Sequence, residues 1–125
     1  MAAKTPEDVD RLFAKHLNAG ALESLAALYE PEAALVNQDG STAHGPAEIG
    51  TALASIIALR PRIRMNVVKT VHIGDSLAAL YNDWTMSATS PDGDLIEIAG
   101  KALEIVRRQS DGTWMFLLDD PFARG

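Results

Sequence analysis

The second half of the chain, residues 62–119, reads RIRMNVVKTVHIGDSLAALYNDWTMSATSPDGDLIEIAGKALEIVRRQSDGTWMFLLD. Residues suited to strands follow a period of two here, and the turn sequences Gly74-Asp75, Pro91-Asp92-Gly93 and Asp111-Gly112 interrupt them. The pattern predicts four strands, at 62–73, 76–89, 95–109 and 113–119. Because the turns between these long strands are short, the strands are expected to form an antiparallel meander.

The residues before this stretch are typical of helices. Thr5 can cap a first helix, Pro6 suits its first position, and Gly20 ends its helical spacing of apolar residues. The further elements expected, in chain order, are a second helix at 21–30, a short hairpin with strands at 33–37 and 41–44, and a third helix at 45–59. Helices followed by consecutive antiparallel strands indicate an α+β fold.

Composition narrows the classes of function. The 125 residues include 11 basic and 17 acidic side chains, a net charge of −6, which disfavours a nucleic-acid partner. There is no cysteine, and the three histidines form no close ligand pair, so we expect no metal. No apolar run approaches the ~18 residues needed to span a bilayer. The N-terminal residues also lack the apolar core of a signal peptide, so we expect a cytoplasmic protein without a membrane partner.

The predicted strands at 76–89 and 113–119 are apolar on both faces. A sheet with one face in water would instead alternate between apolar and polar residues. Three helices can cover one face of the sheet, and a second copy of the chain is the simplest cover for the other. We therefore expect a homodimer.

Three short motifs and the C-terminal residues resemble a known superfamily. The motifs are Leu17-Asn18-Ala19-Gly20, Leu28-Tyr29 at a helix end, and Gly45-Pro46-Ala47-Glu48-Ile49. They resemble the ketosteroid isomerase and SnoaL-like polyketide cyclase superfamily, and residues 103–122 resemble its uncharacterised SnoaL-like branch. The resemblance covers nearly the whole chain. It implies a single domain over residues 1–125 with the cone-shaped, cystatin-like fold of nuclear transport factor two, in which three N-terminal helices pack on a strongly curved, mostly antiparallel sheet.

The superfamily contains isomerases, cyclases, epoxide hydrolases and non-catalytic assembly domains, so the resemblance predicts the fold better than the reaction. Aligned with ketosteroid isomerases, the tyrosine position falls on Phe13, the general-base position on Asn37, and the protonated-acid position near Glu104. Neither Phe13 nor Asn37 can perform the family role at its position. Steroid isomerase chemistry by that mechanism is therefore not expected.

The same alignment turns Tyr81, Asp83 and Asp119 toward an apolar pocket, where Glu104 would join them. Carboxyls this close in a low dielectric cannot all ionise, so at least one should keep its proton near neutral pH. The resemblance thus predicts a general acid–base enzyme of isomerase, cyclase or hydrolase type that needs no cofactor and acts on a small, largely apolar organic molecule. The expected catalytic residues are Asp83, Glu104 and Asp119, and the expected substrate-binding residues are Phe13, Asn37 and Tyr81.

Other interpretations of these residues remain open. Asp119 also suits strand termination, Asn37 suits a turn, and Asp83 and Glu104 suit surface ion pairs. Arg64 or Arg107 could lie between two aspartates, as an arginine does in the family's epoxide hydrolases. The alternative functions are a non-catalytic binding protein and a dimerisation module, and a cavity below roughly 300 Å³ would leave only the latter. The face opposite Asp83 is the expected dimer interface, with Trp84, Met86, Trp114 and Phe116.

Overall fold

The computed structural model of the protein describes residues 2–125, which form three helices and six strands. In chain order they are α1 (Pro6–Ala19), α2 (Leu22–Ala26), β1 (Tyr29–Val36), β2 (Thr42–His44), α3 (Gly45–Ile57), β3 (Arg62–Ile73), β4 (Leu77–Thr89), β5 (Leu95–Arg108) and β6 (Trp114–Asp120). The α+β fold and the four C-terminal strands are confirmed, each strand to within one residue at either end. None of the helices in residues 2–125 combines the length and the apolar character that crossing a bilayer requires.

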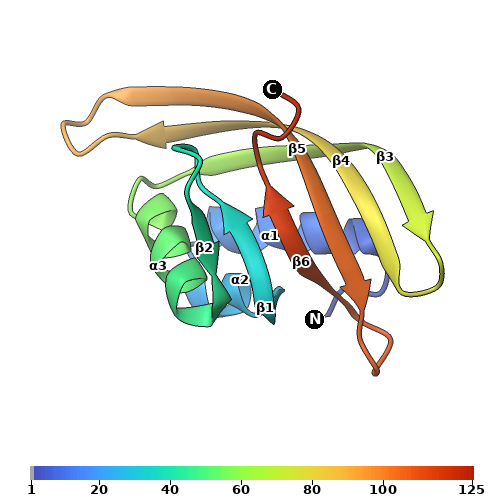
Figure 1. The fold of residues 1–125 in the computed structure, drawn as a ribbon. Helices are drawn as coiled ribbons and strands as arrows, with labels where there is room; N and C mark the ends of the chain where they lie inside the picture. The colour runs from blue at the N-terminus through green and yellow to red at the C-terminus, as the bar shows by residue number, and fades with distance from the viewer. Residues whose placement is uncertain (1) are drawn as a thin grey trace.

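The six strands form one sheet in the order β2-β1-β6-β5-β4-β3. The expected meander from β3 to β6 is antiparallel throughout, whereas β1 joins β6 in parallel. The long strands β3, β4 and β5 curve over α1, and α3 lies against the shorter strands β1 and β2 (Figure 1). The concave face of the sheet is therefore closed by helices from below and at one side.

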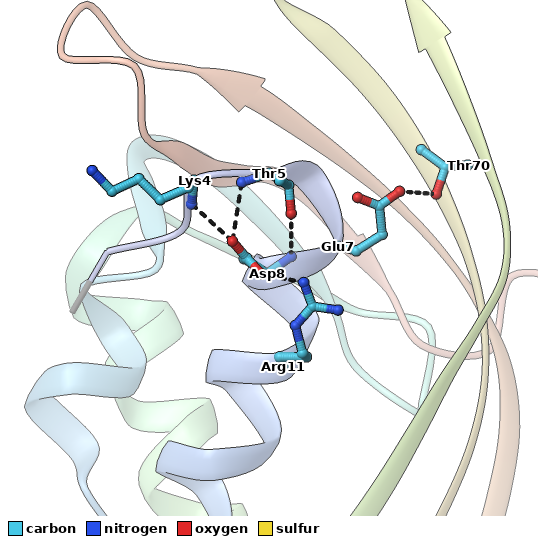
Figure 2. A network of polar contacts seen from close by, with 6 residues as sticks. All are labelled: Lys4, Thr5, Glu7, Asp8, Arg11 and Thr70. Atoms are coloured by element: carbon cyan, nitrogen blue, oxygen red, sulfur yellow. Dashed lines mark hydrogen bonds and ion pairs between the residues drawn. The ribbon is translucent and has the colours of Figure 1, made fainter.

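Helix α1 begins as the sequence predicts. The side chain of Thr5 accepts a hydrogen bond from the Asp8 backbone N–H, and the Asp8 carboxylate accepts one from the Thr5 backbone N–H, so the two residues form a capping box (Figure 2). Asp8 also pairs with Arg11. In the same turn of α1, the Glu7 carboxylate accepts a 2.7 Å hydrogen bond from the Thr70 hydroxyl, which links α1 to β3 (Figure 2).

The second helix is shorter than expected. The sequence predicts a helix over 21–30, but α2 ends at Ala26 and β1 begins at Tyr29. Extended backbone at Tyr29 lets it pair with Phe116 of β6, and Glu30 then accepts hydrogen bonds from Arg107 at 2.9 and 2.5 Å. These tertiary contacts outweigh the local helical preference of the segment.

The two faces of β4 are the reverse of the prediction. Its inner face carries Leu80, Asn82, Trp84 and Met86, while Asp83 lies on the outer face. The expected dimer residues are therefore misplaced: Trp84, Met86, Trp114 and Phe116 are only 7%, 9%, 7% and 0% exposed, and they belong to the core. Because protein interiors are closely packed, the space between the sheet and the helices is filled by the β4 face with the larger apolar side chains, those of Trp84 and Met86.

A β-bulge explains why Phe116 and Asp119 both point inward. In the pairing of β5 with β6, Val106 lies opposite Phe116 and Glu104 lies opposite Asp119, so β6 uses one residue more than β5 over this span. The extra residue reverses the alternation of side chains along β6. As a result Phe116, near the start of β6, contributes an aromatic ring to the core, and Asp119, near its end, contributes a carboxyl.

Candidate functional site

A cavity of about 720 Å³ lies between the concave face of the sheet and helices α1 and α3. Its walls are mainly apolar, and they include Phe13, Leu17, Leu35, Ile63, Met65, Trp84, Met86, Ile98 and Phe122. Exposed polar residues of the β1–β2 hairpin and α3 surround its mouth, namely Gln38, Thr42, Glu48, Thr51 and Ser55. Three buried polar side chains line it as well: Asn82, Glu104 and Asp119. A ligand that fills this space would be largely apolar and would contact two carboxyl groups.

Trp84 shapes one wall of the cavity. It lies opposite Gly100 on β5, and a Cβ atom at Gly100 would lie 2.6 Å from the indole ring. The indole N–H donates a 2.9 Å hydrogen bond to the Pro121 carbonyl, and the ring packs edge-on against Phe122 at 5.3 Å between centroids. Gly100 thus makes room for the indole, which holds the C-terminal segment against the cavity.

Asp119 is buried and takes its one strong hydrogen bond from a phenol. The Tyr29 hydroxyl of β1 donates a 2.6 Å bond to Asp119 Oδ2. Burial raises the pKa of Asp119 from its ordinary 3.8 to about 7, against the opposing effect of the Tyr29 bond, and the negative charge of Asp10 adds to the rise. Burial and the adjacent Asp119 carboxyl raise the pKa of Tyr29 well above 10, so the phenol remains a neutral donor.

Glu104 is 1% exposed and lies directly across from Asp119 on the neighbouring strand. The Asn82 amide donates a 3.3 Å hydrogen bond to Glu104 Oε2, and Asn82 Oδ1 accepts a 3.0 Å bond from the Asn66 backbone N–H. Burial and the neighbouring Asp10 carboxyl raise the pKa of Glu104 well above its ordinary value. Both effects favour the protonated form of Glu104.

Asp10 of α1 completes the cluster, although it does not line the cavity. Its carboxyl lies beside that of Glu104, and burial raises its pKa to about 6. Neither Asp10 oxygen, nor Oε1 of Glu104, receives a hydrogen bond from an N–H or hydroxyl group. Two ionised carboxylates can only accept hydrogen bonds and repel each other, so this pair favours a state in which one of the two carries a proton.

Among residues 2–125, no Lys, Arg or His side chain lines the cavity, so none of these cations offsets the buried carboxyls there. Burial favours the protonated form of both Glu104 and Asp119, and the Tyr29 hydrogen bond favours the ionised form of Asp119. A neutral acid beside a carboxylate is the pairing that general acid–base catalysis requires. Within residues 2–125, no group of three His, Asp or Glu side chains is arranged to hold a metal ion.

The structure places four of the six predicted site residues at the cavity. Glu104 and Asp119 lie among its lining residues, as the resemblance implies, and Phe13 forms part of the wall. Asn37 lies at the mouth, where its amide donates a 3.0 Å hydrogen bond to the Ser41 hydroxyl. Whether these residues act on a substrate stays a prediction.

The predicted placement of Asp83 and Tyr81 in the cavity is wrong, because both lie on the outer face of β4. Asp83 forms a 2.8 Å ion pair with Arg124 and its side chain is 40% exposed. The Tyr81 ring lies near two cations, with Lys69 Nζ 5.5 Å and the Arg124 guanidinium 5.2 Å from its centroid. The arginines considered between two aspartates are also elsewhere: neither Arg64 nor Arg107 lines the cavity.

Sequence reasoning missed three members of the site, Tyr29, Asn82 and Asp10. Two of the three carried a detectable signal. Asn82 lies between Leu80 and Trp84 on one strand face, where a polar residue needs a partner. Asp10 shares the apolar stripe of α1 with Phe13, three residues on. Tyr29 was obscured by its assignment to a helix.

Comparison with known proteins agrees with this geometry. The family model for the SnoaL-like domain matches residues 9–117. The chain belongs to the SnoaL-like domain family. No curated protein matches it.

Solved structures share the fold of this SnoaL-like domain at low sequence identity. A ketosteroid isomerase-like protein from Erwinia carotovora superimposes with a TM-score of 0.82 at 15% identity, over 91% of this chain and 89% of its own. A provisionally named scytalone dehydratase from Novosphingobium aromaticivorans gives 0.82 at 16%, over 91% and 78%. A provisionally named calcium/calmodulin-dependent protein kinase II association domain from Xanthomonas campestris gives 0.82 at 15%, over 95% and 86%. These neighbours establish the cone-shaped, cystatin-like fold, and their names span catalysis and assembly.

Proposed function

We propose that this SnoaL-like domain is a general acid–base enzyme, of isomerase, cyclase or hydrolase type, acting on a small and largely apolar organic molecule in the interior cavity. The observation that carries the proposal is the facing pair of buried carboxyls, Glu104 and Asp119, in the wall of that cavity. Burial raises the pKa of both carboxyls, and their hydrogen-bond partners differ: Asp119 accepts a bond from the Tyr29 hydroxyl, which lowers its pKa, whereas contact with the Asp10 carboxyl raises that of Glu104. Pairs whose environments differ in this way mark acid and base roles.

In the proposed reaction Asp119 is the base and Glu104 the acid. The Asp119 carboxylate takes a proton from a substrate carbon beside a carbonyl, or from a water that attacks an epoxide. Glu104 gives its proton to the oxygen on which negative charge develops. Tyr29 holds Asp119 in position through its 2.6 Å hydrogen bond. One proton is removed and one is added in each cycle, so the net charge of the pair is unchanged.

The cavity supports catalysis or binding over assembly alone. Its volume of about 720 Å³ is well above the smallest ligand sites, which begin at roughly 300 Å³. A domain whose only role is assembly has no use for buried carboxyls without cations, since such groups cost stability when they ionise. The polar mouth and apolar wall instead suit a small molecule with one or two oxygens.

A panel of small cyclic ketones and epoxides tests the proposal. In D₂O, NMR would record deuterium entering the carbon beside the carbonyl, or diol forming from the epoxide. We expect at least one compound to react, and Asp119→Asn and Glu104→Gln to slow that reaction by roughly 100-fold or more, as loss of a general acid or base does. Asp83→Asn is the matched control, because this carboxyl lies outside the cavity, and it should keep the wild-type rate.

Compounds that bind in the cavity without reacting would contradict the catalytic role and identify a binding protein. Equal rates in wild-type protein and both cavity variants would also contradict it. A cavity to which nothing in the panel binds would favour the assembly role.

We also propose that the protein is a homodimer, with the interface on the true outer face of the sheet. This face carries Ile105 beside Leu118 and Leu103 beside Tyr81 on adjacent strands, and all four are half-buried in the single chain. An apolar stripe of this kind is what a second copy would cover. Light scattering should give twice the chain mass, and Ile105→Arg should give the monomer; a wild-type monomer would refute the proposal.

A further inference from the structure

A second cavity, of about 430 Å³, lies between α1 and β3. Its lining residues are Glu7, Asp10, Arg11, Ala14, Met65, Asn66 and Val67. It reaches the surface, because Arg11 and Asn66 on its wall are exposed. Among the described residues, Met65 alone lines both cavities. The two buried carboxyls are divided between them, since Asp10 lines the second cavity and Glu104 lines the main one. The Asp10–Glu104 contact is thus the polar connection between two separate cavities.

Asp10 has no structural partner that would account for its burial. It is 2% exposed, and neither of its oxygens receives a hydrogen bond from an N–H or hydroxyl group. Its helical neighbours are engaged elsewhere, since Glu7 bonds to Thr70 and Arg11 pairs with Asp8 (Figure 2). A buried aspartate without a cation or donor costs stability and suggests a function that needs it.

We propose that Asp10 is a positioning residue that passes protons between water in the second cavity and Glu104, so that Glu104 regains its proton while the main cavity is filled. The inference rests on the proposed function, because it assigns to Asp10 the recharging of the acid used there. A ligand in the main cavity excludes water from Glu104 on that side. The second cavity leaves the far side of the pair in contact with solvent.

The proton steps balance. Glu104 gives its proton to the substrate oxygen and becomes a carboxylate. Asp10, protonated by water in the second cavity, passes that proton to the Glu104 carboxylate, and hydroxide returns to bulk solvent. Asp119 releases the proton it took from the substrate when product leaves the main cavity, which neutralises that hydroxide.

The groups that surround Asp10 support this direction of transfer. Glu104 of β5 and Glu7 of its own helix are the nearest acids, with Asp119 of β6 and Tyr29 of β1 behind Glu104. Burial raises the pKa of both Asp10, to about 6, and Glu104. Asp10 lines the second cavity and can therefore exchange protons with water there, whereas Glu104 is not among the residues that line it.

The test measures proton exchange and needs no substrate. After rapid mixing into D₂O near pH 6, infrared spectroscopy follows the carbonyl band of protonated Glu104, which the Glu104→Gln variant identifies by its loss. Asp10→Asn, which keeps shape and burial but cannot relay a proton, should slow the exchange at least tenfold. Ala14→Leu, which fills the second cavity and leaves both carboxyls in place, should slow it severalfold. Ala47→Trp at the main mouth is the matched control and should leave the exchange rate unchanged.

Slower exchange in Ala47→Trp with wild-type rates in Asp10→Asn and Ala14→Leu would overturn the inference, because protons would then enter through the main cavity. Exchange complete within the mixing time in every variant would also overturn it. Thermal unfolding of each variant checks that it is folded. The outcome is independent of the ketone and epoxide panel: slow exchange with no turnover would leave the proton path intact and refute only the proposed reaction.

Discussion

Replacing Asp119 with asparagine should make the protein more stable at alkaline pH. The folded protein holds the Asp119 proton up to a pKa of about 7, whereas the unfolded chain releases it near 3.8. The folded state therefore binds more protons between these pH values, and this contribution to stability is full below 3.8 and lost as pH rises through about 7. The difference between the folded and unfolded pKa values corresponds to about 4 kcal/mol of stability for an isolated group. It falls to about 2 kcal/mol where the proton is shared with the neighbouring carboxyls Glu104 and Asp10.

The assay is urea unfolding at pH 5 and pH 8.5. Wild-type protein should lose free energy of unfolding between the two, and Asp119→Asn should lose about 1–3 kcal/mol less, because only the two pH units between pH 5 and the pKa of about 7 contribute in this window. Its amide can still accept the Tyr29 hydroxyl but cannot ionise. Glu30→Gln is the matched control. The Arg107 hydrogen bond lowers the pKa of Glu30, so that residue is ionised in both states throughout this window, and its loss should lower stability equally at both pH values. Parallel pH dependence in wild-type protein and Asp119→Asn would refute the account of the buried carboxyls.

Two further substitutions probe the cavity wall. Tyr29→Phe removes the hydrogen bond that lowers the pKa of Asp119. The titration midpoint of Asp119, followed by carboxyl ¹³C NMR, should therefore rise by about one pH unit or more. An unchanged midpoint would show that the phenol does not reach the carboxylate. Gly100→Ala would place a Cβ 2.6 Å from the Trp84 ring, so it should lower the free energy of unfolding by about 1–3 kcal/mol and change tryptophan fluorescence. Ala99→Ser, at the exposed neighbouring position, is the control and should do neither. Wild-type stability in Gly100→Ala would show that the indole has room to move.

The four C-terminal strands were predictable because local signals determine them. Turn residues separate them, and the alternating segments between the turns are long enough that boundary errors stay at one residue. The parallel pairing of β1 with β6 was not predictable in this way. It joins residues about 90 positions apart, such as Tyr29 and Asp119, and no local pattern specifies a contact at that distance in sequence.

Which face of β4 points inward could not be decided from that strand alone. Both faces are rich in apolar residues, and Asp83 and Asn82 place one polar residue on each. Successive side chains of a strand point to opposite faces, so an error in choosing the inner face affects every residue of the strand. The predicted positions of Tyr81, Asp83, Trp84 and Met86 were therefore all wrong together. The pairing of Trp84 with Gly100 carries the missing information, because a glycine within a long strand indicates that something large lies over it.

The prediction that Asp119 points inward was correct, although it assumed a regular alternation of side chains that the bulge in β6 interrupts. The alternation from Phe116 places Asp119 on the opposite face, and the prediction accordingly assigned the two residues to different sides of the sheet. The bulge in β6 brings both to the inner face. One inserted residue thus allows the aromatic ring that packs against Tyr29 and the carboxyl that accepts its hydroxyl to come from one strand. If β6 instead alternated regularly from Phe116 through Leu117 and Leu118, Asp119 would turn outward and the cavity would lose the group that we assign as its base.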